Sequence, residues 1–370
     1  MKNNEAQEVF FELLRAGLWG RLDGETVKPA PIVDWNVVYQ LAEEQSVVGL
    51  VAAGIETLNV EMPLNLKLQF VGATLQLEQR NRAMNQFIER LVGDLRKKDI
   101  YTLLVKGQGI AQCYERPLWR TCGDIDLLLN SSEYEKAKRY LSPMATEIEN
   151  EEKTRLHFGM TLDEWTVELH GTLLTVISES LNKVIRSVQD AIFYTGEVRS
   201  WENGKTLVYL PSPGNDTFLV FSHILEHFYV GGIGLRQICD WCRLLWTYRE
   251  TIDANLLEKR LREAKVMTEW KGFAAFAVDY LGMPPKAMLF YEDSPRWYSI
   301  ARKLRNLILE TGNFGHNKDE SYRRNSSKIR ILVVTFGRRV TEYGRLVSIF
   351  PANASRIFVM YVLGRVRANL

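Results

Sequence analysis

Two aspartates have the spacing of a metal-binding pair. Asp124 and Asp126 belong to the run Asp124-Ile-Asp-Leu-Leu-Leu129, whose short apolar character predicts a β-strand over 125–129. Side chains alternate between the two faces of a strand, so both carboxylates point the same way. Two adjacent negative charges repel each other unless a cation lies between them, and carboxylate oxygens favour Mg²⁺ or Mn²⁺.

A third carboxylate lies on a later predicted strand. Glu168 is placed between apolar residues in Thr166-Val-Glu-Leu-His170. If this strand lies beside the one with the aspartates, the three carboxylates can hold two metal ions about 4 Å apart, as in enzymes that displace groups in line at phosphorus. The alternative is that both segments are ordinary strands with solvated acidic side chains.

A candidate phosphate-binding segment precedes the aspartates. The run 100–105 predicts a strand that ends at Lys106-Gly107, where a short helix over 109–114 begins. Backbone N–H groups at such a junction bind phosphate, and Lys106 adds a positive charge. Together with the three carboxylates, this order predicts a site for phosphoryl or nucleotidyl transfer.

These motifs resemble those of a known family. The resemblance is to the uncharacterised nucleotidyltransferase group of the DNA polymerase β-like nucleotidyltransferase superfamily, and it is clearest over residues 100–175. The motifs that carry it are Lys106-Gly107, Arg120-Thr-Cys-Gly-Asp-Ile-Asp-Leu-Leu128 and Val167-Glu-Leu-His170.

The resemblance implies roles for individual residues. Asp124 and Asp126 match the metal-binding pair of the superfamily, and Glu168 matches its third carboxylate. Lys106 and Gly107 match the phosphate-loop position, with Gln108 standing where the superfamily usually has Gly or Ser. A nucleoside triphosphate (NTP) is the implied substrate, and a divalent metal is the implied cofactor.

Other polar residues lie near these motifs. Arg120 is a candidate contact for the triphosphate or the leaving pyrophosphate, and the alternative is an arginine on a surface loop. His170 shares a strand face with Glu168, so it could bond this carboxylate, bind substrate or be purely structural. His157, on the preceding predicted strand, is assigned a structural role.

Two later segments are candidates for lining the cleft. His223-Ile-Leu-Glu-His227 matches the H-x-x-E-H pattern of some zinc peptidases, and its two histidines share a helix face. A zinc site, a role in lining the nucleotide cleft and plain helix packing remain open. Arg236 and Asp240 are spaced to pair with each other on the next helix, although Arg236 could instead face the cleft.

The elements that must position these residues form three zones. The apolar patterns predict an α+β fold, in which a small mixed β-sheet core is flanked by N-terminal and C-terminal helical regions. The predicted division is 1–98, 99–211 and 212–370. Helices are expected at 9–17, 35–58, 66–98, 216–229, 235–249, 254–262 and 268–281, and further strands at 156–160, 165–170, 197–200 and 206–210. Asn130-Ser131-Ser132 is expected to cap a further helix, with Ser132 and Glu135 in capping-box spacing.

The charge of the chain is unevenly distributed. The 370 residues include 47 Lys+Arg and 45 Asp+Glu, yet residues 321–370 hold ten basic residues and a single acidic one. This Arg-rich tail, expected to be helical in pieces broken at Gly337, Gly344 and Pro351, could bind RNA or DNA phosphates or an anionic membrane. It could also pack on the acidic remainder and add arginine to the cleft.

Composition and targeting signals limit the classes of protein. An apolar fraction of 46% and a charged fraction of 25% are typical of globular proteins and exclude a disordered chain. The N-terminus lacks the order of a signal peptide, and no stretch is long and apolar enough to span a membrane. Four cysteines do not suggest a disulfide framework, so we expect a cytoplasmic protein.

The leading hypothesis is a cytoplasmic, Mg²⁺-dependent nucleotidyltransferase. It would transfer a nucleoside monophosphate from an NTP to a hydroxyl group of an unknown acceptor (a small molecule, a protein or RNA) and release pyrophosphate. One alternative is a catalytically degenerate module that binds nucleotides or partners without turnover. Another is an RNA-directed nucleotidyltransferase or toxin that contacts nucleic acid through 321–370.

Overall fold

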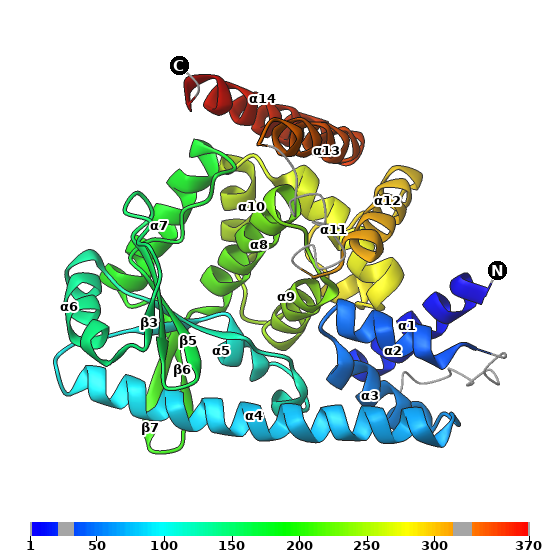
Figure 1. Cartoon of the computed structure of the whole chain (residues 1–370), viewed down its shortest axis with the longest axis horizontal. Coiled ribbons are helices and arrows are strands. Elements are labelled where there is room, and N and C mark those ends of the chain that lie inside the picture. Colours follow the sequence, from blue (N-terminus) through cyan, green and yellow to red (C-terminus); the bar gives the residue numbers. More distant parts are fainter. Residues whose placement is uncertain (1, 21–32, 314–327, 369–370) are drawn as a thin grey trace.

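A mixed β-sheet lies at the centre of the fold. The computed structural model describes residues 2–20, 33–313 and 328–368. Within these segments seven strands form one sheet in the order β3-β4-β5-β2-β1-β7-β6, with helices around it (Figure 1). This arrangement confirms the predicted α+β fold with flanking helices. The strands are β1 (Leu103–Val105), β2 (Asp124–Leu128), β3 (Glu147–Ile148), β4 (His157–Leu162), β5 (Trp165–His170), β6 (Val198–Asn203) and β7 (Thr206–Pro211).

Alternation along the strands gives the sheet two different faces. Ile125 and Leu127 of β2 pack with Val167 of β5 in a core on one face, which is covered by the second half of α4 (Leu64–Arg96) and by α6 (Ser131–Leu141). The intervening acidic residues therefore point to the opposite face, toward α8. The helices within or beside the sheet are α5 (Gly107–Ala111), α6 (Ser131–Leu141) and α7 (Glu179–Thr195), and the last of these was not predicted from the sequence.

The first three helices pack against one another and against the C-terminal helices, and the fourth continues beneath the sheet. They are α1 (Lys2–Trp19), α2 (Trp35–Glu44), α3 (Val48–Leu58) and α4 (Leu64–Arg96). The prediction of one helix over 35–58 was wrong, because the helix is interrupted between α2 and α3. There Ser46 has a φ of 55°, and the buried amide of Gln45 bonds the carbonyl of Ile308 and the N–H of Leu235. Those tertiary bonds stabilise the interruption.

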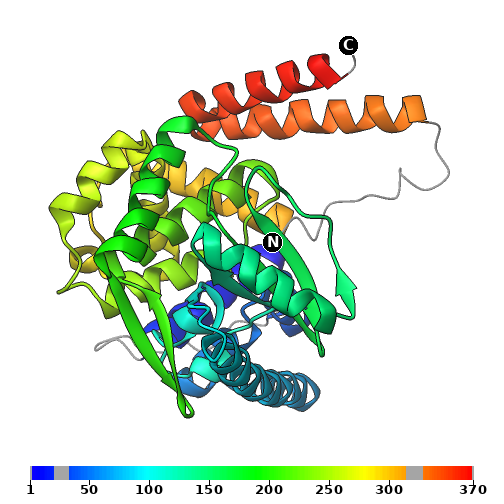
Figure 2. The same cartoon turned by 90° about the vertical axis from the view of Figure 1, so that its left-hand side faces the viewer.

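The C-terminal helices cover the second face and extend beyond it. They are α8 (Pro213–Val230), α9 (Leu235–Thr247), α10 (Ala254–Glu263), α11 (Met267–Leu281), α12 (Pro295–Thr311), α13 (Lys328–Ile349) and α14 (Pro351–Ala368). Figure 2 shows α13 and α14 side by side, projecting beyond the other helices. In the described chain no helix combines the length and apolar character needed to cross a membrane.

The tail has fewer interruptions than the sequence indicated. Helix α13 continues through Gly337 and Gly344, so the predicted breaks at these two glycines were wrong. Only the break at Pro351 is confirmed, where α14 begins. A glycine weakens a helix by only about 1 kcal/mol, which the packing of the helix can offset. Phe350, at the junction, is buried against aromatic rings of α8 and α11.

The close contact between α1 and α3 depends on glycine. A Cβ atom added to Gly54 would lie 1.9 Å from the carbonyl oxygen of Leu13, which is backbone and cannot move aside. We therefore expect Gly54→Ala to lower the free energy of unfolding by about 3 kcal/mol, measured by urea denaturation.

The control for this substitution is on α4. A Cβ atom at Gly72 would meet no atom within 4 Å, so Gly72→Ala should raise stability by up to about 1 kcal/mol through better helix propensity. Equal effects of the two substitutions would contradict the proposed glycine-dependent packing.

Candidate functional site

The pairing of β2 with β5 brings the three carboxylates together. These strands run parallel, with Asp126 directly opposite Glu168 in the register. Asp124 lies on the same face of β2, and the three side chains each offer an oxygen within 4.8 Å of the others. The predicted grouping of the three carboxylates depended on the strand of Glu168 lying beside that of the aspartates. In the structure these two strands are neighbours.

Lys106 and Gly107 form the adjoining edge of the site. Lys106 follows β1, which pairs with β2, and its Nζ lies 3.0 Å from Oδ1 of Asp126. Burial opposes the charge, but Asp126, Asp124 and Glu168 together raise the pKa of Lys106. Gly107, the first residue of α5, has a φ of 41°, and an added Cβ atom would lie 3.3 Å from the sulfur of Cys122. A larger residue would disturb this junction.

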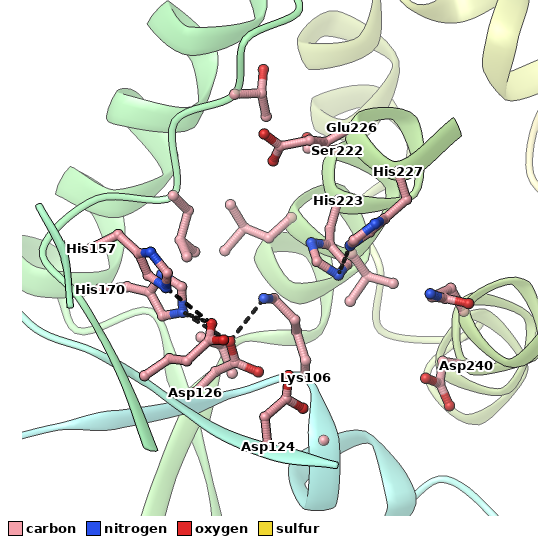
Figure 3. A pocket seen from close by; sticks show the side chains of 18 of the residues that line it. Lys106, Asp124, Asp126, His157, His170, Ser222, His223, Glu226, His227 and Asp240 are labelled. Carbon is pink, nitrogen blue, oxygen red and sulfur yellow. Dashed lines mark hydrogen bonds and ion pairs between the residues drawn. The ribbon is translucent and has the colours of Figure 1, made fainter. Parts of the chain in front are cut away.

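Two histidines contact the carboxylates from the side of β4 and β5. Nε2 of His170 lies 2.8 Å from Oδ1 of Asp126 and 3.3 Å from Oε2 of Glu168. Nε2 of His157 lies 3.1 Å from that same oxygen of Glu168 (Figure 3). Although burial disfavours the charged imidazole, these two carboxylates raise the pKa of His170. His157 was assigned a structural role from its place in the sequence, although the β4–β5 hairpin register brings it opposite His170.

The carboxylates differ in their electrostatic surroundings. Asp126 is buried, but Lys106 and His170 outweigh burial and lower its pKa. Burial also opposes ionisation of Glu168, and hydrogen bonds from the two histidines lower its pKa well below the usual range. The pKa of Asp124 is raised, first by the charge of Asp126 and then by burial. A dication beside Asp124 would relieve this repulsion.

These side chains line a cavity of about 510 Å³ between the sheet and the helices α8 and α9. The volume lies within the usual range of small-molecule sites. The three carboxylates, Lys106 and both histidines form one wall (Figure 3). The opposite wall includes His223, His227 and Glu226 of α8 and Arg236 and Asp240 of α9.

Comparison with known proteins places the chain in a family. A family model described as uncharacterised nucleotidyltransferase matches residues 31–282. The chain belongs to this family. The matched range contains every residue of the cavity walls, whereas α12, α13 and α14 lie outside it. No curated protein and no solved structure matches the chain.

Gln108, next to the predicted phosphate-binding residues, points away from the cavity. The side chain is buried on the far side of α5, where its Nε2 donates to Oδ1 of Asn81 and it is not among the cavity-lining residues. Asn81 of α4 in turn donates to the carbonyls of Leu118 and Arg120. The side chain of Gln108, predicted to bind the nucleotide, therefore lies outside the cavity wall.

Arg120 forms a buried ion pair that sequence spacing did not reveal. Its guanidinium donates two hydrogen bonds to the carboxylate of Asp240, at 3.1 and 2.6 Å, and both side chains are buried. Tyr114 donates a third bond to this carboxylate. The spacing left open whether Arg236 pairs with Asp240 or faces the cleft. In the structure Arg236 lines the cavity, and its guanidinium donates to the carbonyl of Thr121. Both arginines thus fix the loop that leads into β2, and both line the cavity.

The H-x-x-E-H segment does not assemble a zinc-peptidase site in the described chain. His223 and His227 face the cavity with their Nε2 atoms 3.0 Å apart, but Glu226 binds Arg155. No group of three potential ligands found among the described residues includes either histidine. Burial and the charges of Lys106 and Arg236 lower the pKa of His227 to about 4. These histidines therefore present neutral imidazoles opposite the carboxylates.

Lys106 has a backbone conformation that favours glycine. Its φ of 59° and ψ of −144° are unfavourable for a residue with a Cβ atom. We expect Lys106→Gly to be more stable than Lys106→Ala by about 1 kcal/mol, because both remove the ammonium but only glycine relieves the strain. Thermal or urea unfolding of the two variants is the measurement, and equal stability would contradict the strain.

The Arg120–Asp240 pair provides a stability test. We expect Arg120→Met to lower the free energy of unfolding by about 3–5 kcal/mol, because it leaves the charge of Asp240 buried without its partner. The control, Arg116→Met, removes the exposed pair with Glu56 and should change stability by less than about 1 kcal/mol. Urea denaturation compares both with the unsubstituted protein. Similar losses in the two variants would count against the buried pair.

Proposed function

We propose that the protein is a metal-dependent nucleotidyltransferase that transfers a nucleoside monophosphate from an NTP to an acceptor hydroxyl and releases pyrophosphate. The observation that carries the proposal is the convergence of Asp124, Asp126 and Glu168 on one cavity beside Lys106. Family membership supports the reaction class.

The donor set fits divalent metal ions. The oxygens of Asp124, Asp126 and Glu168 are the ligands that Mg²⁺ and Mn²⁺ prefer, and the raised pKa of Asp124 reflects uncompensated negative charge. When bound there, such ions neutralise phosphate charge and polarise the phosphorus centre. Asp124 and Asp126 would hold them, with Glu168 completing the second site.

The residues of the chain would position the two reactants. The ammonium of Lys106 and the N–H of Gly107 would bind the triphosphate. Arg236 would add positive charge at the α9 side of the cavity, where Arg120 is paired with Asp240. The acceptor oxygen would attack the α-phosphorus as the bond from that phosphorus to the bridging oxygen breaks. Glu168 would orient the acceptor hydroxyl, whose proton would be lost to solvent as pyrophosphate leaves.

The cavity beyond the carboxylates is the proposed acceptor subsite. Thr172, Thr175 and Ser222 line it together with the Arg155–Glu226 ion pair, so this region offers both hydrogen-bond donors and acceptors. The walls suit a polar acceptor that carries hydroxyl groups. None of the described tail residues lines the cavity, so the structure offers no specific support for an RNA acceptor bound through the tail.

Substitution of Asp126 tests the proposal. We expect Asp126→Asn to weaken Mg²⁺-dependent NTP binding and to reduce transfer of label from an α-³²P-labelled NTP by about 100-fold or more. Calorimetry with each of the four NTPs measures binding. Transfer is counted separately in metabolite, protein and RNA fractions.

The control is Asp163→Asn, at the exposed turn between β4 and β5, which should leave both quantities unchanged. Equal Mg-NTP binding by Asp126→Asn and the unsubstituted protein would refute the site. Binding without transfer into any fraction would instead favour the degenerate module.

A further inference from the structure

A second set of ligand atoms lies next to the three carboxylates. It comprises Nε2 of His157, Nε2 of His170 and Oε2 of Glu168, all within 4.8 Å of one another. Both nitrogens approach the same oxygen, at 3.1 and 3.3 Å. All three residues line the cavity, so an ion in solution has a path to them.

Strand register fixes this set before any ion binds. His157 of β4 lies directly opposite His170 of β5 in the antiparallel ladder, and Glu168 is two residues before His170 on the same strand face. The two imidazole rings are stacked, with centroids 4.8 Å apart and an interplanar angle of 27°. Both Nε2 atoms thereby approach the same oxygen of Glu168, and Figure 3 shows the two rings side by side.

We propose that His157, His170 and Glu168 bind a first-row transition-metal ion such as Zn²⁺, at a site distinct from the oxygen-only set that includes Asp124. Imidazole nitrogen favours Zn²⁺ and similar ions, whereas Mg²⁺ favours oxygen and retains its water. Two histidines and one glutamate supply three ligands and leave a fourth position open toward the cavity. Binding there requires no nucleotide, so the inference goes beyond the proposed function.

Glu168 belongs to both ligand sets, which couples them. An ion held by the two histidines would bind Oε2 of Glu168, which leaves Oε1 to bind an ion held by the aspartates. The competing explanation is a hydrogen-bonded cluster in which the histidines only position Glu168. The two explanations differ in one measurable property, the contribution of His157 to affinity for zinc.

Competition with a chromophoric zinc chelator tests the site on the full chain after treatment with EDTA. We expect the protein to bind Zn²⁺ more tightly than Mg²⁺, and His157→Asn to weaken Zn²⁺ binding by about 100-fold, since even residues behind metal ligands contribute 10–100-fold. Affinity for Mg²⁺ should be preserved in this variant. The matched variant Asp124→Asn should show the reverse, with Mg²⁺ binding weakened and Zn²⁺ binding retained.

Cobalt provides a readout that does not depend on a variant. Co²⁺ bound to nitrogen and oxygen in a four-coordinate site absorbs visible light strongly, so adding Co²⁺ to the unsubstituted protein should produce these bands, and Zn²⁺ should remove them. Absence of the bands, or equal loss of Zn²⁺ affinity in His157→Asn and Asp124→Asn, would overturn the proposal. Failure here with intact Mg-NTP binding leaves the proposed transferase site standing.

Discussion

Mutual repulsion of three carboxylates is the constraint on which this site depends. Asp124, Asp126 and Glu168 lie within 4.8 Å of one another in a partly closed cavity, where water screens charge poorly. Lys106 and His170 both bond Asp126, and His170 also bonds Glu168. These contacts lower the pKa of Asp126 and Glu168, whereas the charge of Asp126 raises the pKa of Asp124. A cation that binds beside Asp124 would relieve this repulsion.

The fold supplies this arrangement through a few strand pairings. β2 lies between β1 and β5, so the strand with the aspartates receives Lys106 from one neighbour and Glu168 from the other. The hydrophobic core under the opposite face fixes the register, because a slip of one residue would exchange buried leucines for acids. The helices α8 and α9 then close the cavity over the acidic face.

Local patterns in the sequence predicted the strands well and the long-range contacts poorly. The range 165–170 agrees with β5, and alternation in this strand correctly placed Glu168 and His170 on one face. The expected cap segment begins at the correct residue, since Asn130 caps α6 and accepts bonds from the N–H groups of Ser132 and Glu133. The capping box of Ser132 and Glu135 was wrong, because Ser132 lies inside the helix. The Arg120–Asp240 pair could not be inferred, since spacing within one helix carries no information about a partner 120 residues away. Likewise, the hydrogen bond between Gln108 and Asn81 depends on how α4 crosses the sheet.

Helix α4 connects the N-terminal helices to the underside of the sheet. Its 33 residues make it about 50 Å long, with one half beneath the sheet and the other beside α3 (Figure 1). Asn81, near the middle, is hydrogen-bonded both to Gln108, next to Gly107, and to the carbonyl of Arg120, in the loop before β2. Because these bonds meet at one residue of a continuous helix, the position of α4 along the sheet sets both the turn at Gly107 and the segment leading to the aspartates, while the other half of the same helix packs beside α3.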